Sequence, residues 1–149
     1  MRFVADSMLG KLARYLRIMG YDTVYQKSYS DQRLSELVKE GRILLTRSNA
    51  RFAKYPHSIF IDRDMVGDQL RAVDINIGLD RDQNKWFTRC IVCNSVLTKP
   101  DQAIAREHVP DFVTFSYPQQ VRFCPSCKRF YWPGTHHERM LARLKNWGF

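Results

Sequence analysis

Hydrophobic positions in the first 85 residues follow two alternating patterns, short apolar runs and longer stretches of helical spacing. The apolar runs predict four buried strands, at residues 2–5, 23–25, 43–45 and 58–61. Apolar residues three and four positions apart predict three helices between or after them, at residues 9–16, 31–40 and 66–73. Ser7 and Ser30 are candidate N-caps, and Gly20 and Gly41 are candidate helix ends. This β-α-β-α-β order predicts an α/β fold, a parallel sheet with helices on both faces.

Residues 86–149 show a different pattern, in which short aromatic runs surround four cysteines and five prolines. We interpret this segment as hairpins organised by a metal, followed by a helix over residues 135–146. Thr135 and Glu138 fit the capping-box pattern at the start of that helix, which makes Thr135 its expected N-cap. The sequence therefore predicts two parts, residues 1–85 and 86–149.

The charge of the chain suggests a polyanionic partner. Among 149 residues, 24 Lys and Arg stand against 15 Asp and Glu, a net charge of +9. Residues 1–85 carry 15 basic and 11 acidic side chains, and the shorter second part carries 9 and 4. Nucleic acid is the expected partner, and simple solubility is the alternative explanation. No apolar run reaches the roughly 18 residues of a membrane span, and the first residues do not form a signal peptide, so we expect a cytoplasmic protein.

The four cysteines form two Cys-x-x-Cys pairs with 30 residues between them. A tight knuckle at each pair can aim two thiolates at one ion, and two knuckles complete a tetrahedral site for zinc. The alternative, a redox pair, prefers the start of a helix in a thioredoxin-like unit, and neither pair has that setting. We therefore predict one structural zinc ion, bound by Cys90, Cys93, Cys124 and Cys127.

Acidic residues at predicted strand ends suggest a second metal site. Asp6 and Asp62 follow strands, Asp31 starts a helix, and Asp64 lies close by. Because functional crevices of open α/β sheets lie outside the carboxyl ends of the strands, these side chains are expected at one edge. Mg²⁺ or Mn²⁺ held there could activate water for phosphodiester hydrolysis. The alternative for each aspartate is a solvated helix cap or strand end.

Basic residues near these positions are candidate contacts for RNA phosphates. In the first part they are Lys11, Arg14 and Arg47, and beside the second cysteine pair they are Lys128 and Arg129. Aromatic residues around Lys128 and Arg129 could stack on bases or form the core of the ribbon.

Several segments taken together resemble a known family. They are the opening Phe-Val-Ala-Asp-Ser-Met-Leu-Gly-Lys-Leu-Ala-Arg, the run Gly-Arg-Ile-Leu-Leu-Thr-Arg at residues 41–47, and Arg-Cys-x-x-Cys-Asn at 89–94. Asp31, Val-Pro at 109–110 and Cys-Pro-x-Cys with Tyr-Trp-x-Gly-Thr-His at 124–136 continue the likeness. The chain resembles the PIN-like ribonuclease family with a C-terminal zinc ribbon, which is named for the C-terminal part of the nematode mutator exonuclease.

The resemblance implies a PIN-like fold and metal-dependent cleavage of RNA, with Asp6 and Asp31 as ligands of Mg²⁺ or Mn²⁺. It also implies a carboxylate at position 48, where this chain has Ser48. Ser48 can still offer a neutral oxygen, and Asp62 or Asp64 can compensate for the missing charge. The leading expectation is a ribonuclease. The alternative is an RNA-binding adaptor with weakened or lost catalysis. A homodimer is possible but no motif of the chain marks an interface.

Overall fold

The structure, a computed structural model, describes residues 1–149. The chain divides into two compact units, Met1–Asn94 and Ser95–Phe149. Residues 86–94 fall in the first unit, to which both their backbone and their side chains are hydrogen-bonded: Phe87 N–H donates to the Ile18 carbonyl at 2.7 Å, and the Arg89 side chain donates through Nε to the Gly20 carbonyl at 3.1 Å. The functional division at residues 85 and 86 stays a prediction.

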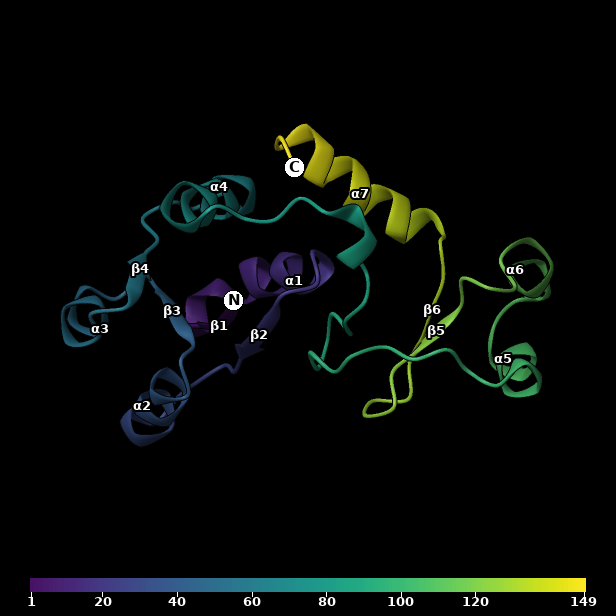
Figure 1. The fold of residues 1–149 in the computed structure, drawn as a ribbon, viewed down its shortest axis with the longest axis horizontal. Coiled ribbons are helices and arrows are strands. Elements are labelled where there is room, and N and C mark those ends of the chain that lie inside the picture. Colours follow the sequence, from purple (N-terminus) through teal and green to yellow (C-terminus); the bar gives the residue numbers. More distant parts are fainter. The chain divides into compact units, whose positions relative to one another are not determined.

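A four-stranded parallel sheet organises the first unit (Figure 1), with the strand order β2-β1-β3-β4. The strands are β1 (Arg2–Ala5), β2 (Asp22–Tyr25), β3 (Ile43–Thr46) and β4 (Ser58–Phe60). All four predicted strands are therefore present and parallel. The central strands β1 and β3 are apolar because both faces of the sheet are covered.

Helices cover both faces of this sheet, as the α/β prediction requires. They are α1 (Gly10–Ile18), α2 (Asp31–Lys39), α3 (Asn49–Lys54) and α4 (Val66–Ile77), with short 3₁₀ turns η1 (Ser7–Leu9) and η2 (Gln83–Lys85). In Figure 1, α1 and α4 lie on one side of the sheet and α2 and α3 on the other. Leu34 and Leu37 of α2 share a buried cluster with Val4 of β1 and Leu44 of β3, which are register partners.

Two predicted helix caps were wrong, each for a reason visible in the backbone. Ser7 does not cap the first helix: the Asp6 carboxylate accepts from Ser7 N–H at 2.7 Å and caps η1 instead. Helix α3, which the sequence did not predict, begins directly after β3 and is capped by Ser48. Thr135 lies inside the last helix, whose N-cap is Gly134 and makes no side-chain bond.

The second unit contains short elements around a small core. They are α5 (Gln102–His108), α6 (Asp111–Ser116), β5 (Arg122–Phe123), β6 (Phe130–Tyr131) and α7 (Thr135–Asn146). Strands β5 and β6 form the expected hairpin, and α7 is the expected C-terminal helix. The buried cluster is Ala105, Val109, Val113 and Val121, with Tyr117, Phe130 and Trp132 packed against it. No helix in either unit is both long and apolar enough to cross a bilayer.

Gly20 ends α1 in a conformation that a side chain would disrupt. Its φ is 90°, and a Cβ at this position would collide with the Lys85 carbonyl oxygen. Gly148 ends α7 with φ 91° and the same pair of helix-end hydrogen bonds, but open space surrounds it. Left-handed backbone costs alanine roughly 1–2 kcal/mol, and overpacking adds typically 1–3 kcal/mol. We therefore expect Gly20→Ala to lower the free energy of unfolding by about 2–5 kcal/mol.

Gly148→Ala is the matched control because it carries the backbone strain without the collision. Chemical denaturation of both variants, with zinc present, measures the difference. Equal destabilisation by the two substitutions would show that the contact between Gly20 and Lys85 does not limit the space there.

Candidate functional site

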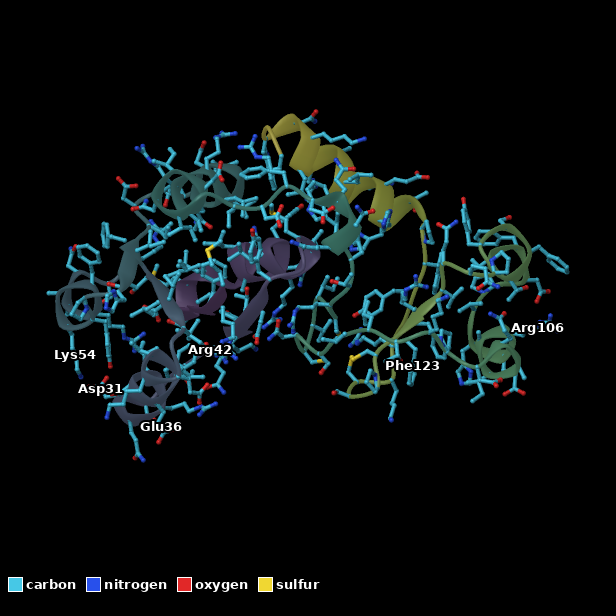
Figure 2. The ribbon with its side chains drawn as sticks, viewed as in Figure 1. Asp31, Glu36, Arg42, Lys54, Arg106 and Phe123 are labelled. Carbon is cyan, nitrogen blue, oxygen red and sulfur yellow. The ribbon has the colours of Figure 1, made fainter.

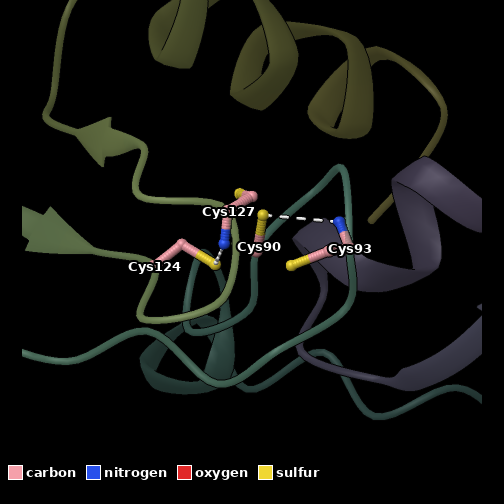
Figure 3. A group of neighbouring side chains, drawn as sticks. All are labelled: Cys90, Cys93, Cys124 and Cys127. Atoms are coloured by element: carbon pink, nitrogen blue, oxygen red, sulfur yellow. Dashed lines mark hydrogen bonds between the residues drawn. The ribbon is translucent and has the colours of Figure 1, made fainter.

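Four cysteines form a group that can hold a metal ion (Figure 3). The Sγ atoms of Cys90, Cys93, Cys124 and Cys127 all lie within 4.8 Å of one another. A tetrahedron with Zn–S bonds of about 2.3 Å has edges of about 3.8 Å, so four thiolates at this spacing fit zinc. Both pairs lie in turns rather than at the start of a helix, which disfavours the thioredoxin-like alternative. The chain therefore has the cysteine cluster of a zinc ribbon.

The two cysteine pairs share one backbone geometry. Cys93 N–H donates to Cys90 Sγ at 3.4 Å, and Cys127 N–H donates to Cys124 Sγ at 3.4 Å. One residue further on, Asn94 and Lys128 adopt left-handed φ values of 73° and 59°, and their N–H groups donate to the carbonyls of Cys90 and Cys124 at 2.9 Å. The N–H groups of Cys93 and Cys127 would compensate the negative charge of metal-bound sulfur atoms. The spacing Cys-x-x-Cys therefore produces the same knuckle twice.

Arg17 holds the first knuckle, defined as residues 90–94, against the sheet. Its side chain comes from α1 and is only 5% exposed. Nε donates to the Thr23 carbonyl at 2.9 Å, and Nη1 donates to the carbonyls of Ile91 and Val92 at 3.1 and 2.9 Å. Burial lowers the pKa of Arg17, and the nearby sulfur atoms of the knuckle oppose this shift. The two residues between the metal-binding cysteines are thus fixed by a buried guanidinium.

Asn94 joins the same knuckle to the edge of β2. Its Oδ1 accepts from Thr23 N–H at 2.9 Å, and its Nδ2 donates to Asp22 Oδ1 at 2.7 Å. Arg42 makes two further bonds to the Asp22 carboxylate, at 2.8 and 3.2 Å. Burial raises the pKa of Asp22, but these hydrogen bonds outweigh it and bring the pKa below its ordinary value. The knuckle and the sheet therefore share one polar network.

Asp6 lies at the carboxyl end of the central strand β1 and is only 4% exposed. Its N–H donates to the Leu45 carbonyl at 2.9 Å, which extends the pairing of β1 with β3. Its carboxylate accepts from Ser7 N–H and from Thr46 Oγ1, both at 2.7 Å. Tyr29 lies close by, and burial, aided by the Asp6 charge, raises the pKa of Tyr29 to about 12. Asp6 is thus a buried carboxylate held by donors from η1 and from β3.

Ser48 and Arg51 complete the surroundings of Asp6. Ser48 Oγ accepts from Arg51 N–H at 3.3 Å as the cap of α3, and Ser48 N–H donates to Thr46 Oγ1 at 3.0 Å. Arg51 Nη1 forms an ion pair with Asp6 Oδ1. Sequence reasoning assigned no site role to Thr46 and did not consider Arg51. The position of Arg51 depends on helix α3, which has no apolar stripe. Ser48, as an N-cap residue, was the only sequence signal for this helix.

The other candidate carboxylates pair with separate cations. Asp31 of α2 lies beside Lys54 of α3 at 3.2 Å (Figure 2) and its side chain is 78% exposed. The side chain of Asp62 is 60% exposed and pairs with Arg63 at 3.2 Å, and the exposed Asp64 pairs with Arg47 at 2.7 Å. The four cysteines are the one cluster of three or more His, Cys, Asp or Glu side chains that could hold a metal ion. As these side chains stand, they supply no ready set of three carboxylates for Mg²⁺ or Mn²⁺.

Comparison with known families identifies the chain. The sequence model of the Mut7-C RNAse domain matches residues 1–144, which is nearly the whole chain. This chain belongs to the Mut7-C RNAse domain family. A search of curated proteins and a search of solved structures find no match. The suspected family is therefore confirmed, and membership points to a nuclease-like role with RNA as the substrate class.

The candidate phosphate contacts of this Mut7-C RNAse domain differ in whether an aspartate already pairs with them. Lys11 and Arg14 lie exposed on α1, one and two turns beyond Asp6. Arg47 is engaged by Asp64, and Lys128 and Arg129 are exposed beside the second knuckle. Three ion pairs with aspartates lie at the carboxyl edge of the sheet. Their cations are Arg47, Arg51 and Lys54. Exposed pairs of this kind contribute little stability, so an RNA phosphate can replace the carboxylate partner of Arg47 or Lys54.

Proposed function

We propose that this chain hydrolyses RNA phosphodiesters at the carboxyl edge of its parallel sheet. The observation that carries the proposal is the position of Asp6, a buried carboxylate at the end of the central strand in a chain of a ribonuclease family. A buried carboxylate that loses its protein partners must find another cation or take up a proton. Asp6 is therefore the group around which a catalytic site is expected, with Ser48 beside it.

The proposal includes Mg²⁺ or Mn²⁺ as the cofactor, with Asp6 and Asp31 as the carboxylate ligands and Asp62 as a further candidate. A divalent ion would supply an activated water and stabilise the leaving oxygen. What supports this is the chemistry of oxygen donors at one sheet edge, together with the family. The donors on Asp6, above all Arg51, occupy the oxygens that such an ion needs.

The zinc ribbon has a separate place in the proposal. We assign it a structural zinc ion and, through Lys128 and Arg129, a share of RNA binding. Both side chains are exposed, and Lys128 Nζ lies over the Phe123 ring, 5.8 Å from its centroid. A reduced Cys₄ site belongs in a reducing compartment, so the proposal places the protein in the cytoplasm.

A second candidate function is RNA binding without cleavage. Two specific observations favour it: position 48 holds a neutral hydroxyl, and Arg51 neutralises Asp6. A chain of this kind would hold RNA phosphates with its basic side chains and leave the phosphodiester intact. Binding and hydrolysis must therefore be measured separately.

Substitution of Asp6 tests the leading proposal. The substrates are labelled single-stranded and hairpin RNA with added Mg²⁺ or Mn²⁺. We expect the wild type to cleave them and Asp6→Asn to cleave at least about 100-fold more slowly, because a neutral amide lacks the negative charge that attracts the divalent ion. Asp68→Asn is the matched control, because Asp68 is a half-buried aspartate that pairs with Arg71 on α4. Metal dependence is tested by omitting the divalent salt, since a chelator would also strip the cysteine cluster.

Three outcomes separate the candidates. Equal cleavage by the wild type and Asp6→Asn would contradict the proposed site. Equal RNA affinity of both proteins with no cleavage by either would establish the second candidate. Failure of both proteins to bind RNA would overturn both functions.

Salt dependence of RNA binding tests the phosphate contacts. For single-stranded RNA the logarithm of affinity falls with the logarithm of salt by about 0.7 per phosphate contact. We expect Lys11→Gln/Arg14→Gln to reduce this slope by about 1.4 and Lys128→Gln/Arg129→Gln to reduce it by a similar amount. Fluorescence anisotropy across a salt series measures each slope. An unchanged slope in either double variant would remove that pair from the proposed RNA surface.

A further inference from the structure

Arg51 lies against Asp6 and is itself largely buried. The Arg51 side chain is 26% exposed, and the Asp6 side chain that it contacts is 5% exposed. Its backbone is fixed as well, because Arg51 N–H donates to Ser48 Oγ and its carbonyl accepts from Tyr55 N–H at 3.1 Å. The guanidinium therefore approaches Asp6 from the first turns of a helix that begins at the sheet edge.

The charges around Asp6 balance without any added ion. Asp6 contributes one negative charge and Arg51 one positive charge, while Thr46 Oγ1 and Ser7 N–H donate as neutral groups. Ser48 adds a hydroxyl that is already used as the helix cap. A buried carboxylate needs one compensating cation, and here the protein provides it.

The neighbouring cations do not have this role. Lys54 and Arg47 pair with Asp31 and Asp64, whose side chains are 78% and 84% exposed. Water compensates such carboxylates well, so these two cations add little. Of the three pairs, only the one formed by Arg51 neutralises a carboxylate that water cannot reach.

We infer that Arg51 is the resident cation of Asp6 and competes with divalent metal for it. The guanidinium contacts Oδ1 of the Asp6 carboxylate, and its charge opposes the approach of a second cation. The affinity of this edge for Mg²⁺ or Mn²⁺ is therefore set by Arg51. The inference rests on the proposed function in taking the carboxyl edge as the site, and it deepens that proposal by naming the residue that regulates metal loading.

Binding of Mn²⁺ in the absence of RNA tests this inference. Electron paramagnetic resonance reports free Mn²⁺ during titration of the zinc-loaded full chain. We expect wild type to bind Mn²⁺ weakly and Arg51→Gln to bind about tenfold tighter or more, since glutamine keeps a donor for Asp6 but removes the charge. Arg51→Lys keeps the charge and is expected to bind as weakly as wild type. Asp6→Asn/Arg51→Gln is expected to lose the gain.

Arg71→Gln is the control, because Arg71 is an arginine of α4 that pairs with an aspartate other than Asp6, namely Asp68. Tight stoichiometric binding by the wild type that Arg51→Gln leaves unchanged would overturn the inference. An equal gain in Arg51→Lys and Arg51→Gln would also overturn it, because charge would then not be the cause. If Arg51→Gln does not fold, Ser48→Asp is the second variant: aspartate also caps helices, and the inference expects it to bind Mn²⁺ less than tenfold tighter than wild type. A gain above tenfold with Arg51 in place would count against it.

Absence of RNA cleavage leaves the inference standing, because Mn²⁺ binding is measured without RNA. Cleavage by the wild type at a Mg²⁺ requirement that Arg51→Gln does not lower would contradict the inference while supporting the proposed function. The two proposals can therefore fail separately.

Discussion

Removal of metal from the cysteine cluster is expected to unfold the second unit from Ser95 to the end of β6. This part has a hairpin with two residues in each strand and a buried cluster of one alanine and three valines, against which three partly buried aromatic side chains pack. This is too little apolar burial to order it without a metal. Structural zinc contributes about 10–16 kcal/mol in peptides with such sites, so its loss exceeds the stability of a small unit. Hydrogen exchange before and after chelation measures the effect, with the amides of Cys127 and Lys128 as the clearest reporters.

One zinc ion per chain is expected before chelation, and addition of zinc should restore protection. Cys124→Ser should reproduce the unfolded state without a chelator. Ser126→Ala is the matched control, because Ser126 lies in the same knuckle but its Oγ contacts only Ser95 Oγ at 2.7 Å. Full protection of the β5 and β6 amides in the metal-free protein would show that the hairpin does not depend on the ion.

Replacement of Arg17 by methionine is expected to have the second largest effect. Three carbonyls, those of Thr23, Ile91 and Val92, would lose a charged donor inside the protein. Hydrogen bonds to charged groups contribute about 1.5–3 kcal/mol each, and the three share one side chain, so we expect a loss of about 3–5 kcal/mol in the free energy of unfolding. Hydrogen exchange of the β1 and β3 amides in the zinc-loaded protein measures this loss.

Arg17→Lys separates charge from geometry. Lysine keeps the positive charge but lacks the planar fork that reaches carbonyls on both sides, so it should recover only part of the stability. Full recovery by lysine would mean that charge alone holds the knuckle. A loss below about 1 kcal/mol in the methionine variant would show that water satisfies the three carbonyls.

The strands and the zinc cluster could be predicted because their signals are local. Each strand of the sheet is a short apolar run, and the Cys-x-x-Cys spacing by itself determines a knuckle. Helices α1, α2, α4 and α7 bury one side, so their apolar residues recur at helical spacing. These parts of the fold therefore follow from periodicity and spacing.

The helices that were missed lack an apolar stripe. Helix α3 buries no side chain, and its phenylalanine, Phe52, is largely exposed. Helices α5 and α6 bury one residue each, and they lie in the segment that was interpreted as hairpins organised by a metal. In the structure the Asp101 side chain caps α5, and Pro110 stands at the N-cap position of α6. Their start signals were present in the sequence, but periodicity was not.

The candidate site was harder to predict than the fold because it depends on side chains from several elements. Asp6 was identified from its place after β1, and the structure holds it there. Its partner Arg51 comes from the missed helix, so no sequence pattern could pair the two. The roles of Asp31, Asp62 and Ser48 in the site stay predictions. The spacing of residues along the chain does not predict which cation an exposed carboxylate pairs with.

The bond between Asn94 and β2 has a consequence for solubility. Strand β2 is at the edge of the sheet, and an open edge is a template for pairing with another chain. The Asn94 side chain accepts the N–H of Thr23 on that edge and bonds to the Asp22 carboxylate. A chain whose first knuckle has come loose is expected to expose this edge and to aggregate through it. Zinc bound at the four cysteines would then protect the sheet from self-association.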